Sequence, residues 1–257
     1  MSGPRRPSSL LLGLLVLLAA GCARALPPPR QPVGEDARRA IALLVERWHA
    51  FSDLRALAEV RVARGDERRH LQGVLLARAP SSVRFEALSP FGQPALLLTI
   101  HDGQLLAYNA ASNQALAGPA TADTAARLLG LPFEPDDLVG ILAGRPVPPR
   151  DVRVAELLPA DEAGPSLGLI GGDWRQRVWM DFATGVVRQV EITGGRYEVR
   201  VVYQRGAGGE VTGFDFAAAQ SYLTGSVRYR QAVFDGGVDP ERFRLTLPER
   251  ATVERLR

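Results

Sequence analysis

From Leu54 onward, the chain consists of short stretches in which apolar and polar residues alternate, separated by turns. In the run from Glu59 to Val62, for example, charged residues and valines alternate, and the same period of two recurs as far as Tyr229. Alternation of this kind is typical of antiparallel strands with one covered face. Glycine-containing turns such as Asp102-Gly103 indicate hairpins between them. The pattern predicts about ten or eleven strands in a single curved antiparallel sheet.

Two regions have helical rather than strand periodicity. The first begins at Glu35 and Asp36, whose charges favour a helix N-terminus, and places its apolar residues on one stripe: Ile41, Leu44, Val45, Trp48 and Phe51. The second runs from Thr121 to Leu142 and predicts two short helices. Thr121 or Asp123 caps the first of them and Gly130 ends it, while Pro135 begins the other and Gly144 ends it. A mainly β (α+β) domain with a helical cover fits these signals.

The first 21 residues are typical of an export signal. Arg5 and Arg6 precede an apolar run from Leu10 to Leu18, and small residues follow it. The run is too short to span a bilayer, which requires about 20 apolar residues. We therefore expect residues 1–21 to be removed from the mature protein.

Cys22 is the only cysteine in the chain and lies at the expected cleavage site. The sequence Ala19-Ala20-Gly21-Cys22 resembles a bacterial lipobox, in which the cysteine is acylated and becomes the new N-terminus. The alternative is an ordinary secretory signal that ends near a cysteine. Residues 22–36 are rich in proline and predict an extended tether, and residues 37–257 predict the folded domain. Ala23 stands where an Asp favours inner-membrane retention, so the outer membrane is expected.

Composition argues against several functional classes. The formal net charge of +3 falls to +1 without Arg5 and Arg6, which is no signature of nucleic-acid binding. The three histidines show no metal-ligand spacing, so neither a metal nor another cofactor is expected. Gly164-Pro165-Ser166-Leu167-Gly168 matches the nucleophile-elbow pattern but lacks a preceding strand and a following helix. We expect a hairpin turn there and no enzyme activity.

The segment from Ser89 to Pro94 is an unusual turn. Its two prolines and Gly92 predict a turn between two apolar strands, but the tip carries the large aromatic side chain of Phe91 where polar residues are usual. Two interpretations remain open: Phe91 is exposed for a function, or it folds back into the core.

Four local features occur in this order along the chain: Cys22, the helix around Trp48, the loop Ser89-Pro90-Phe91-Gly92, and the run Leu128-Leu129-Gly130-Leu131-Pro132 leading to Leu138, Ile141, Leu142 and Gly144. In this order they resemble the LolB-type outer-membrane lipoprotein receptors and the related LolB-like lipoproteins. That family has an Asn-Pro-Leu-Gly loop whose exposed Leu hands lipoproteins to the membrane, and Phe91 matches that position, flanked by Pro90 and Gly92. The C-terminal half matches only in strand pattern and in its Phe243 to Pro248 ending.

The resemblance implies an incomplete antiparallel β-barrel with a helical lid over an apolar concave face. It also implies a monomeric lipoprotein, anchored to the outer membrane and facing the periplasm, that accepts lipoprotein acyl chains from a LolA-type carrier and inserts them into the membrane. Residues expected to line or cover the cavity are Trp48, Phe85, Leu97, Leu129, Leu138 and Leu142. Three alternatives stay open: binding of another amphiphile such as a glycolipid or fatty acid, a structural envelope-assembly subunit, and a hydrolase built on Ser166.

Overall fold

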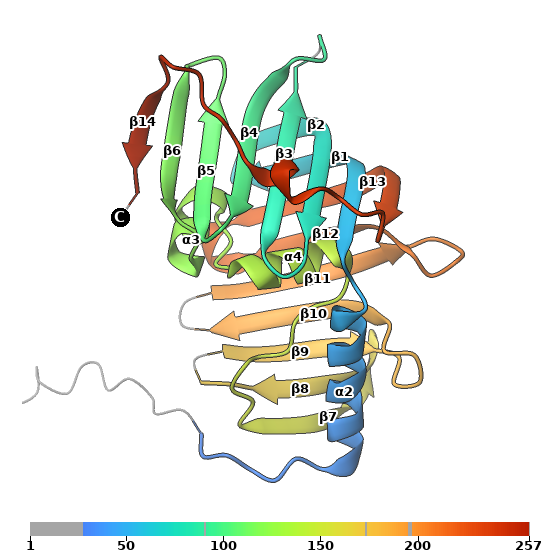
Figure 1. The fold of residues 1–257 in the computed structure, drawn as a ribbon. Coiled ribbons are helices and arrows are strands. Elements are labelled where there is room, and N and C mark those ends of the chain that lie inside the picture. Colours follow the sequence, from blue (N-terminus) through green and yellow to red (C-terminus); the bar gives the residue numbers. More distant parts are fainter. Residues whose placement is uncertain (1–27, 90, 173, 195–196, 257) are drawn as a thin grey trace, which may run out of the picture.

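The computed structural model describes residues 28–89, 91–172, 174–194 and 197–256 (Figure 1). The predicted export signal and Cys22 lie outside the described residues. The described helices are α2 (Glu35–His49), α3 (Ala122–Leu129) and α4 (Pro135–Ala143), with short 3-10 helices η2 (Ala219–Ser221) and η3 (Pro240–Phe243). The strands are β1 (Asp53–Arg64), β2 (Glu67–Arg78), β3 (Ser82–Leu88), β4 (Pro94–His101), β5 (Gln104–Asn109), β6 (Gln114–Pro119), β7 (Val154–Asp161), β8 (Gly164–Ile170), β9 (Trp174–Met180), β10 (Val187–Gly194), β11 (Tyr197–Arg205), β12 (Val211–Ala218), β13 (Leu223–Phe234) and β14 (Thr252–Arg255).

All the strands belong to one curved sheet with the order β14-β6-β5-β4-β3-β2-β1-β13-β12-β11-β10-β9-β8-β7. Neighbouring strands are antiparallel except for β14, which pairs in parallel with β6. The long strands β1 and β13 pair along their length and join the two halves of the sheet. Because β14 and β7 stand at opposite ends of the order, the sheet does not close. The predicted incomplete barrel is confirmed.

The sheet contains more strands than the ten or eleven predicted. The added β14 is short and exposed along its length, so it lacks the alternation that marks the other strands. The segment Gly164–Gly168 was expected to be a hairpin turn, and that prediction is wrong. It lies in strand β8, which pairs with both β7 and β9, and the turn lies just before it.

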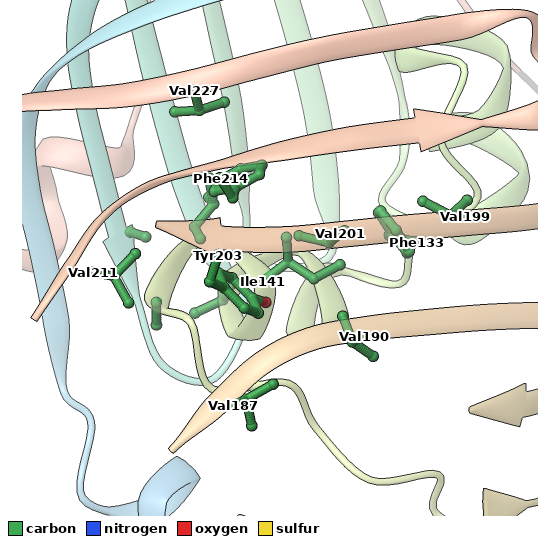
Figure 2. Packing of buried hydrophobic residues seen from close by; sticks show 14 of the residues in the cluster. Phe133, Ile141, Val187, Val190, Val199, Val201, Tyr203, Val211, Phe214 and Val227 are labelled. Carbon is green, nitrogen blue, oxygen red and sulfur yellow. The ribbon is translucent and has the colours of Figure 1, made fainter. Parts of the chain in front are cut away.

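The concave face of the sheet carries the main hydrophobic core. Cross-strand pairs such as Val190 with Val178 and Val190 with Val201 put their side chains on this face. Figure 2 shows how side chains from β10 to β13 gather around Ile141 of α4 and Phe133, which precedes α4. Burial of apolar surface of this kind contributes about 25 cal/mol per Å² and is the main force that stabilises the fold.

The helices cover the concave face, as predicted. Pro135 begins α4, Gly144 ends it in the left-handed conformation at φ 67°, and α4 contacts β2 and β3. Five consecutive residues of α4, from Val139 to Ala143, are buried. The helix α3 is shallower, because only Thr124 and Ala125 are buried in it. The sheet and α4 thus form one packed unit, and α3 lies nearer the surface.

The C-terminal segment crosses the opposite, convex face of β3 and β4 (Figure 1). Phe243 of η3 is almost fully buried there and stacks on His101 at a centroid distance of 5.9 Å. Arg84 of β3 donates hydrogen bonds to the carbonyl oxygens of Arg242 and Arg244. In the described part of the chain, no helix has the length and apolar character needed to cross a bilayer.

Candidate functional site

The hairpin between β3 and β4, which we call the Phe91 loop (residues 89–93), presents its aromatic side chain to solvent. Phe91 is 90% exposed, more than any other large hydrophobic residue among those described. The Ser89 backbone N–H donates to the Gln93 carbonyl and the Gly92 N–H to the Ser89 carbonyl, so the loop is a hydrogen-bonded turn. Gly92 has φ 76°, which favours glycine. Phe91 does not fold back into the core; Pro90 lies outside the described residues.

The predicted tether is partly attached to the domain. The Gln31 backbone N–H donates to the Arg153 carbonyl at 2.8 Å, and the Arg153 guanidinium donates to the Pro28 carbonyl. Arg30 forms an ion pair with Asp151. The chain from Pro28 onward therefore runs along the segment before β7.

The predicted cavity residues fall into three groups. Phe85 and Leu138 are half-buried against the concave core, and Leu142 is buried within it. Trp48 also packs against this core and stacks on Phe51 at 6.2 Å, so it contributes to packing beside α2. The third group, Leu97 and Leu129, does not pack against this core.

Leu97 does not face the concave side. In the register of β3 and β4, Phe85 pairs with Leu98 and Glu86 pairs with Leu97. Because side chains alternate between faces, Leu98 lies on the concave face with Phe85 and Leu97 on the convex face. In α3, Leu128 rather than Leu129 packs against the core and lines a pocket. In β4 and in α3, the residue that faces the core is therefore the direct neighbour of the one predicted.

Two pockets lie on the concave side. The first, here called the lid pocket, has a volume of about 260 Å³ and lies between the α3–α4 connection, residues 147–151 and strands β9 and β10. The second, the edge pocket, has a volume of about 440 Å³. Its apolar lining residues are Leu96, Ala107, Ala115, Leu116 and Leu128, and its polar ones are Asn109, Ser112, Gln114, Thr252 and Glu254. Small-molecule sites commonly measure about 300–1,000 Å³. The edge pocket falls within this range, and the lid pocket falls just below it.

The Phe91 loop and the edge pocket share one end of β4. Leu96, in the pocket wall, follows the loop by a few residues and pairs with Asn109, which also lines the pocket. The apolar tip and the edge pocket therefore lie toward the same end of β4.

The lid pocket combines apolar walls with polar groups. Phe133, Val147 and Ile192 supply apolar surface, and Gln176 and Asp137 supply polar groups. Burial and the neighbouring Asp136 carboxylate raise the pKa of Asp137 to about 7, although the Glu134 backbone N–H donates to its carboxyl and opposes the shift. Asp136 is ion-paired with Arg150.

Ser166 is fully buried on β8, and its hydroxyl accepts a hydrogen bond from Arg177 Nε at 2.9 Å. The nearby acid, Asp161, is held by Arg177 and by the Trp179 indole N–H. Across the described ranges, no histidine forms a hydrogen bond with Ser166. Nor do three or more His, Cys, Asp or Glu side chains there come together in a way that could hold a metal ion.

No protein-family model matches the sequence, and no curated protein matches it. The fold, however, is shared with several solved structures. A domain from Vibrio parahaemolyticus, provisionally assigned as an outer membrane lipoprotein-sorting protein, has a TM-score of 0.55 at 14% sequence identity and covers 80% of this chain and 97% of its own. A LolA-superfamily protein from Nitrosomonas europaea has a TM-score of 0.54 at 13% identity, and the match covers 81% of this chain and 97% of that one.

A DUF1329-family protein from Desulfovibrio piger is similar to the same extent. Its TM-score is 0.56 at 11% identity, and the match covers 82% of this chain and 98% of that one. At such low identities the likeness concerns the fold alone. The chain therefore shares its fold with these three structures.

Proposed function

We propose that this protein is a lipoprotein that binds the acyl chains of other lipoproteins on its concave face and inserts them into the outer membrane, without enzymatic chemistry. The observation that carries the proposal is the 90% exposed Phe91 at the tip of a hydrogen-bonded hairpin. A side chain of this kind is costly to leave in water, because burying it yields about 1.5–3 kcal/mol. A membrane would provide that burial.

The concave face supports the proposal through its chemistry. Acyl chains need apolar area rather than directional bonds, at about 0.8 kcal/mol for each buried methylene. The edge pocket, with Leu96, Ala107 and Leu116 in its wall, supplies area of this kind on the strand that follows the Phe91 loop. Because α3 has fewer buried residues than α4, moving it to enlarge this pocket would cost less than moving α4.

The N-terminal sequence and one structural neighbour support the proposed site in the cell. Acylation of Cys22 would hold the domain on a membrane, and Ala23 after it favours the outer membrane. The Vibrio parahaemolyticus neighbour is itself assigned to outer-membrane lipoprotein sorting. On this basis we place the protein on the periplasmic side of the outer membrane, as a monomer that receives its cargo from a LolA-type carrier.

The test is delivery of a fluorescent lipoprotein from its carrier into liposomes. Phe91→Glu should leave the fold intact, because the side chain makes little contact with the rest of the protein, but it should block delivery. Tyr222→Glu is the matched control, since Tyr222 is also an exposed aromatic residue, at 81%, and lies between β12 and β13. Unchanged delivery by Phe91→Glu would show that the loop takes no part in delivery. Equal loss in both variants would show that any exposed aromatic residue has the same effect as Phe91.

A second candidate is carriage of another amphiphile, and the polar end of the lid pocket favours it. Mass spectrometry of material that copurifies with the Cys22→Ala protein separates the two. Acylated protein or peptide would support the receptor function, and a free glycolipid or fatty acid would support the second candidate.

A further inference from the structure

The chain between the expected lipid anchor and α2 is held against the domain beside β7. The Gln31 N–H donates to the Arg153 carbonyl at 2.8 Å, and the Arg153 guanidinium donates back to a tether carbonyl at 3.3 Å. Arg30 and Arg153 both bind the Asp151 carboxylate, at 2.5 and 2.9 Å. We call residues 28–31 the docked tether. Its contacts take these residues out of the length of chain that is free to extend.

The contacts of the docked tether are few and lie at the surface. The side chain of Arg30 is 75% exposed and that of Asp151 38% exposed, and exposed ion pairs of this kind contribute little to stability. Val33, which follows the docked tether, packs against the hydrophobic core. Release of the docked tether therefore costs little and leaves the folded domain unchanged from Val33 onward.

The docked tether and the Phe91 loop lie at opposite ends of the domain, and the β3–β4 hairpin points away from the docked tether (Figure 1). In the order of the sheet, β3 stands nine positions from β7, beside which the tether is docked. At about 4.8 Å for each position, the path along the curved sheet is about 43 Å.

The length of free chain decides what this separation means for a protein anchored at Cys22. Six residues, 22–27, precede the docked tether, and fully extended they span at most about 22 Å. Release would lengthen the free chain to residues 22–32, which span at most about 40 Å. The shorter chain covers only half of the path along the sheet, whereas the longer one nearly equals it. With the tether docked, the sheet must lie along the membrane for Phe91 to meet it.

Resting on the proposed function, we propose that the docked tether is a strap that restrains the Phe91 loop. While the tether is docked, the β3–β4 hairpin cannot point at the membrane that holds Cys22. Release lets the domain turn, so that the Phe91 side chain enters the bilayer. Because burial of Phe91 in the membrane is possible in this orientation only after release, contact with the membrane shifts the population toward the released state.

The experiment measures how the Phe91 loop contacts liposomes when the full-length protein is anchored in them by its lipid. A fluorophore on Gln93→Cys reports contact through quenching by nitroxide-labelled lipid. Gln93 is exposed, so Phe91 is left intact, and the Cys22 thiol is blocked by its own lipid. Arg30→Glu combined with Arg153→Ala removes the ion pairs and the guanidinium bond, and we call this protein the release variant.

Quenching should be weak in the parent and should rise at least about twofold in the release variant, because a chain too short to span a gap gives an effective concentration near zero. Exchange of the Gln31 amide hydrogen should become about tenfold faster in the release variant, as expected when one hydrogen bond is lost. This second measurement reports on docking itself, without the membrane.

Two controls separate docking from charge and from length. Arg39→Glu makes the same charge change at an exposed arginine of α2 that pairs only with Glu35 and Asp36, and its quenching should match that of the parent. A flexible Gly-Ser insertion of about five residues directly before Pro28 lengthens the free chain but leaves the docking contacts in place. It should raise quenching as much as release does.

Equal quenching of the parent and the insertion variant would overturn the strap, because the docked length would then set no limit. A rise with the insertion but none in the release variant would overturn it as well, since the contacts beside β7 would then not restrain the loop. Quenching in none of the proteins would overturn both the strap and the membrane contact of Phe91. Delivery by the Cys22→Ala protein, which has no anchor, tests the proposed function separately. If that delivery depends on Phe91, the proposed function stands even where the strap fails.

Discussion

Two buried tyrosines in the concave core differ in one respect, which makes them a matched pair. Tyr229 of β13 donates its hydroxyl to the Leu142 carbonyl of α4 at 2.7 Å. Tyr203 of β11 is equally buried, but its hydroxyl has no hydrogen-bond partner among the described residues (Figure 2). Removing each hydroxyl should therefore have opposite consequences for the free energy of unfolding.

The magnitude for Tyr229→Phe follows from the end of α4. The Leu142 carbonyl is one of the last four of the helix, which have no intrahelical partner. Without the Tyr229 hydroxyl this carbonyl would be buried and unsatisfied, at a cost of about 1–3 kcal/mol. Tyr203→Phe removes a buried polar group that has no partner, so it should leave stability unchanged or raise it.

The assay is urea unfolding of the Cys22→Ala protein and of the same protein with either substitution, followed by circular dichroism. For a chain of this size, each kcal/mol should also lower the melting temperature by about 2–4 °C. The order expected is Tyr203→Phe at or above the parent and Tyr229→Phe below it. Equal destabilisation by the two substitutions would refute the reasoning, because it would show that the hydrogen bond from Tyr229 to the Leu142 carbonyl adds nothing to the free energy of unfolding.

Two further predictions concern stability. Because the folded state holds the Asp137 proton up to about pH 7 and the unfolded chain releases it near pH 3.8, stability should fall as the pH rises between these values, and Asp137→Asn should flatten the fall in urea titrations. Gly73→Ala should cost at least about 2 kcal/mol in the same assay, since its Cβ would lie 2.0 Å from the Glu86 carbonyl oxygen. In Gly172→Ala the added Cβ meets nothing within 4 Å, so this control should change stability by less than about 0.5 kcal/mol.

Local signals predicted the elements well where the physical cause is itself local. Thr121 accepts from the Thr124 backbone N–H and caps α3, and Gly130 ends that helix at φ 75°. Asp102 and Gly103 both have positive φ, as a tight hairpin requires. In each case the cause is local: a side chain binds a backbone N–H a few residues away, or a residue adopts a positive φ that its own side chain permits.

Alternation fails as a guide where apolar residues occupy both faces. In β4, Leu96, Leu97 and Leu98 follow one another, so the sequence does not mark which of them faces the core. Pairing with β3 decides it: Leu98 pairs with Phe85 on the concave face, and Leu97 faces the other way. The short strand β14 was not predicted, because all its residues are exposed and its sequence shows no alternation; only its pairing with β6 identifies it as a strand.

The sequence by itself determined the kinds of element, most of their ends and the apolar tip at Phe91, because periodicity and turn chemistry depend on near neighbours. Only the tertiary structure decided that this tip is exposed and that Gln176 and Asp137 line one pocket. These facts depend on strand register and on how α4 packs into the curved sheet. Both are set by contacts between residues far apart in the chain, which no local pattern records.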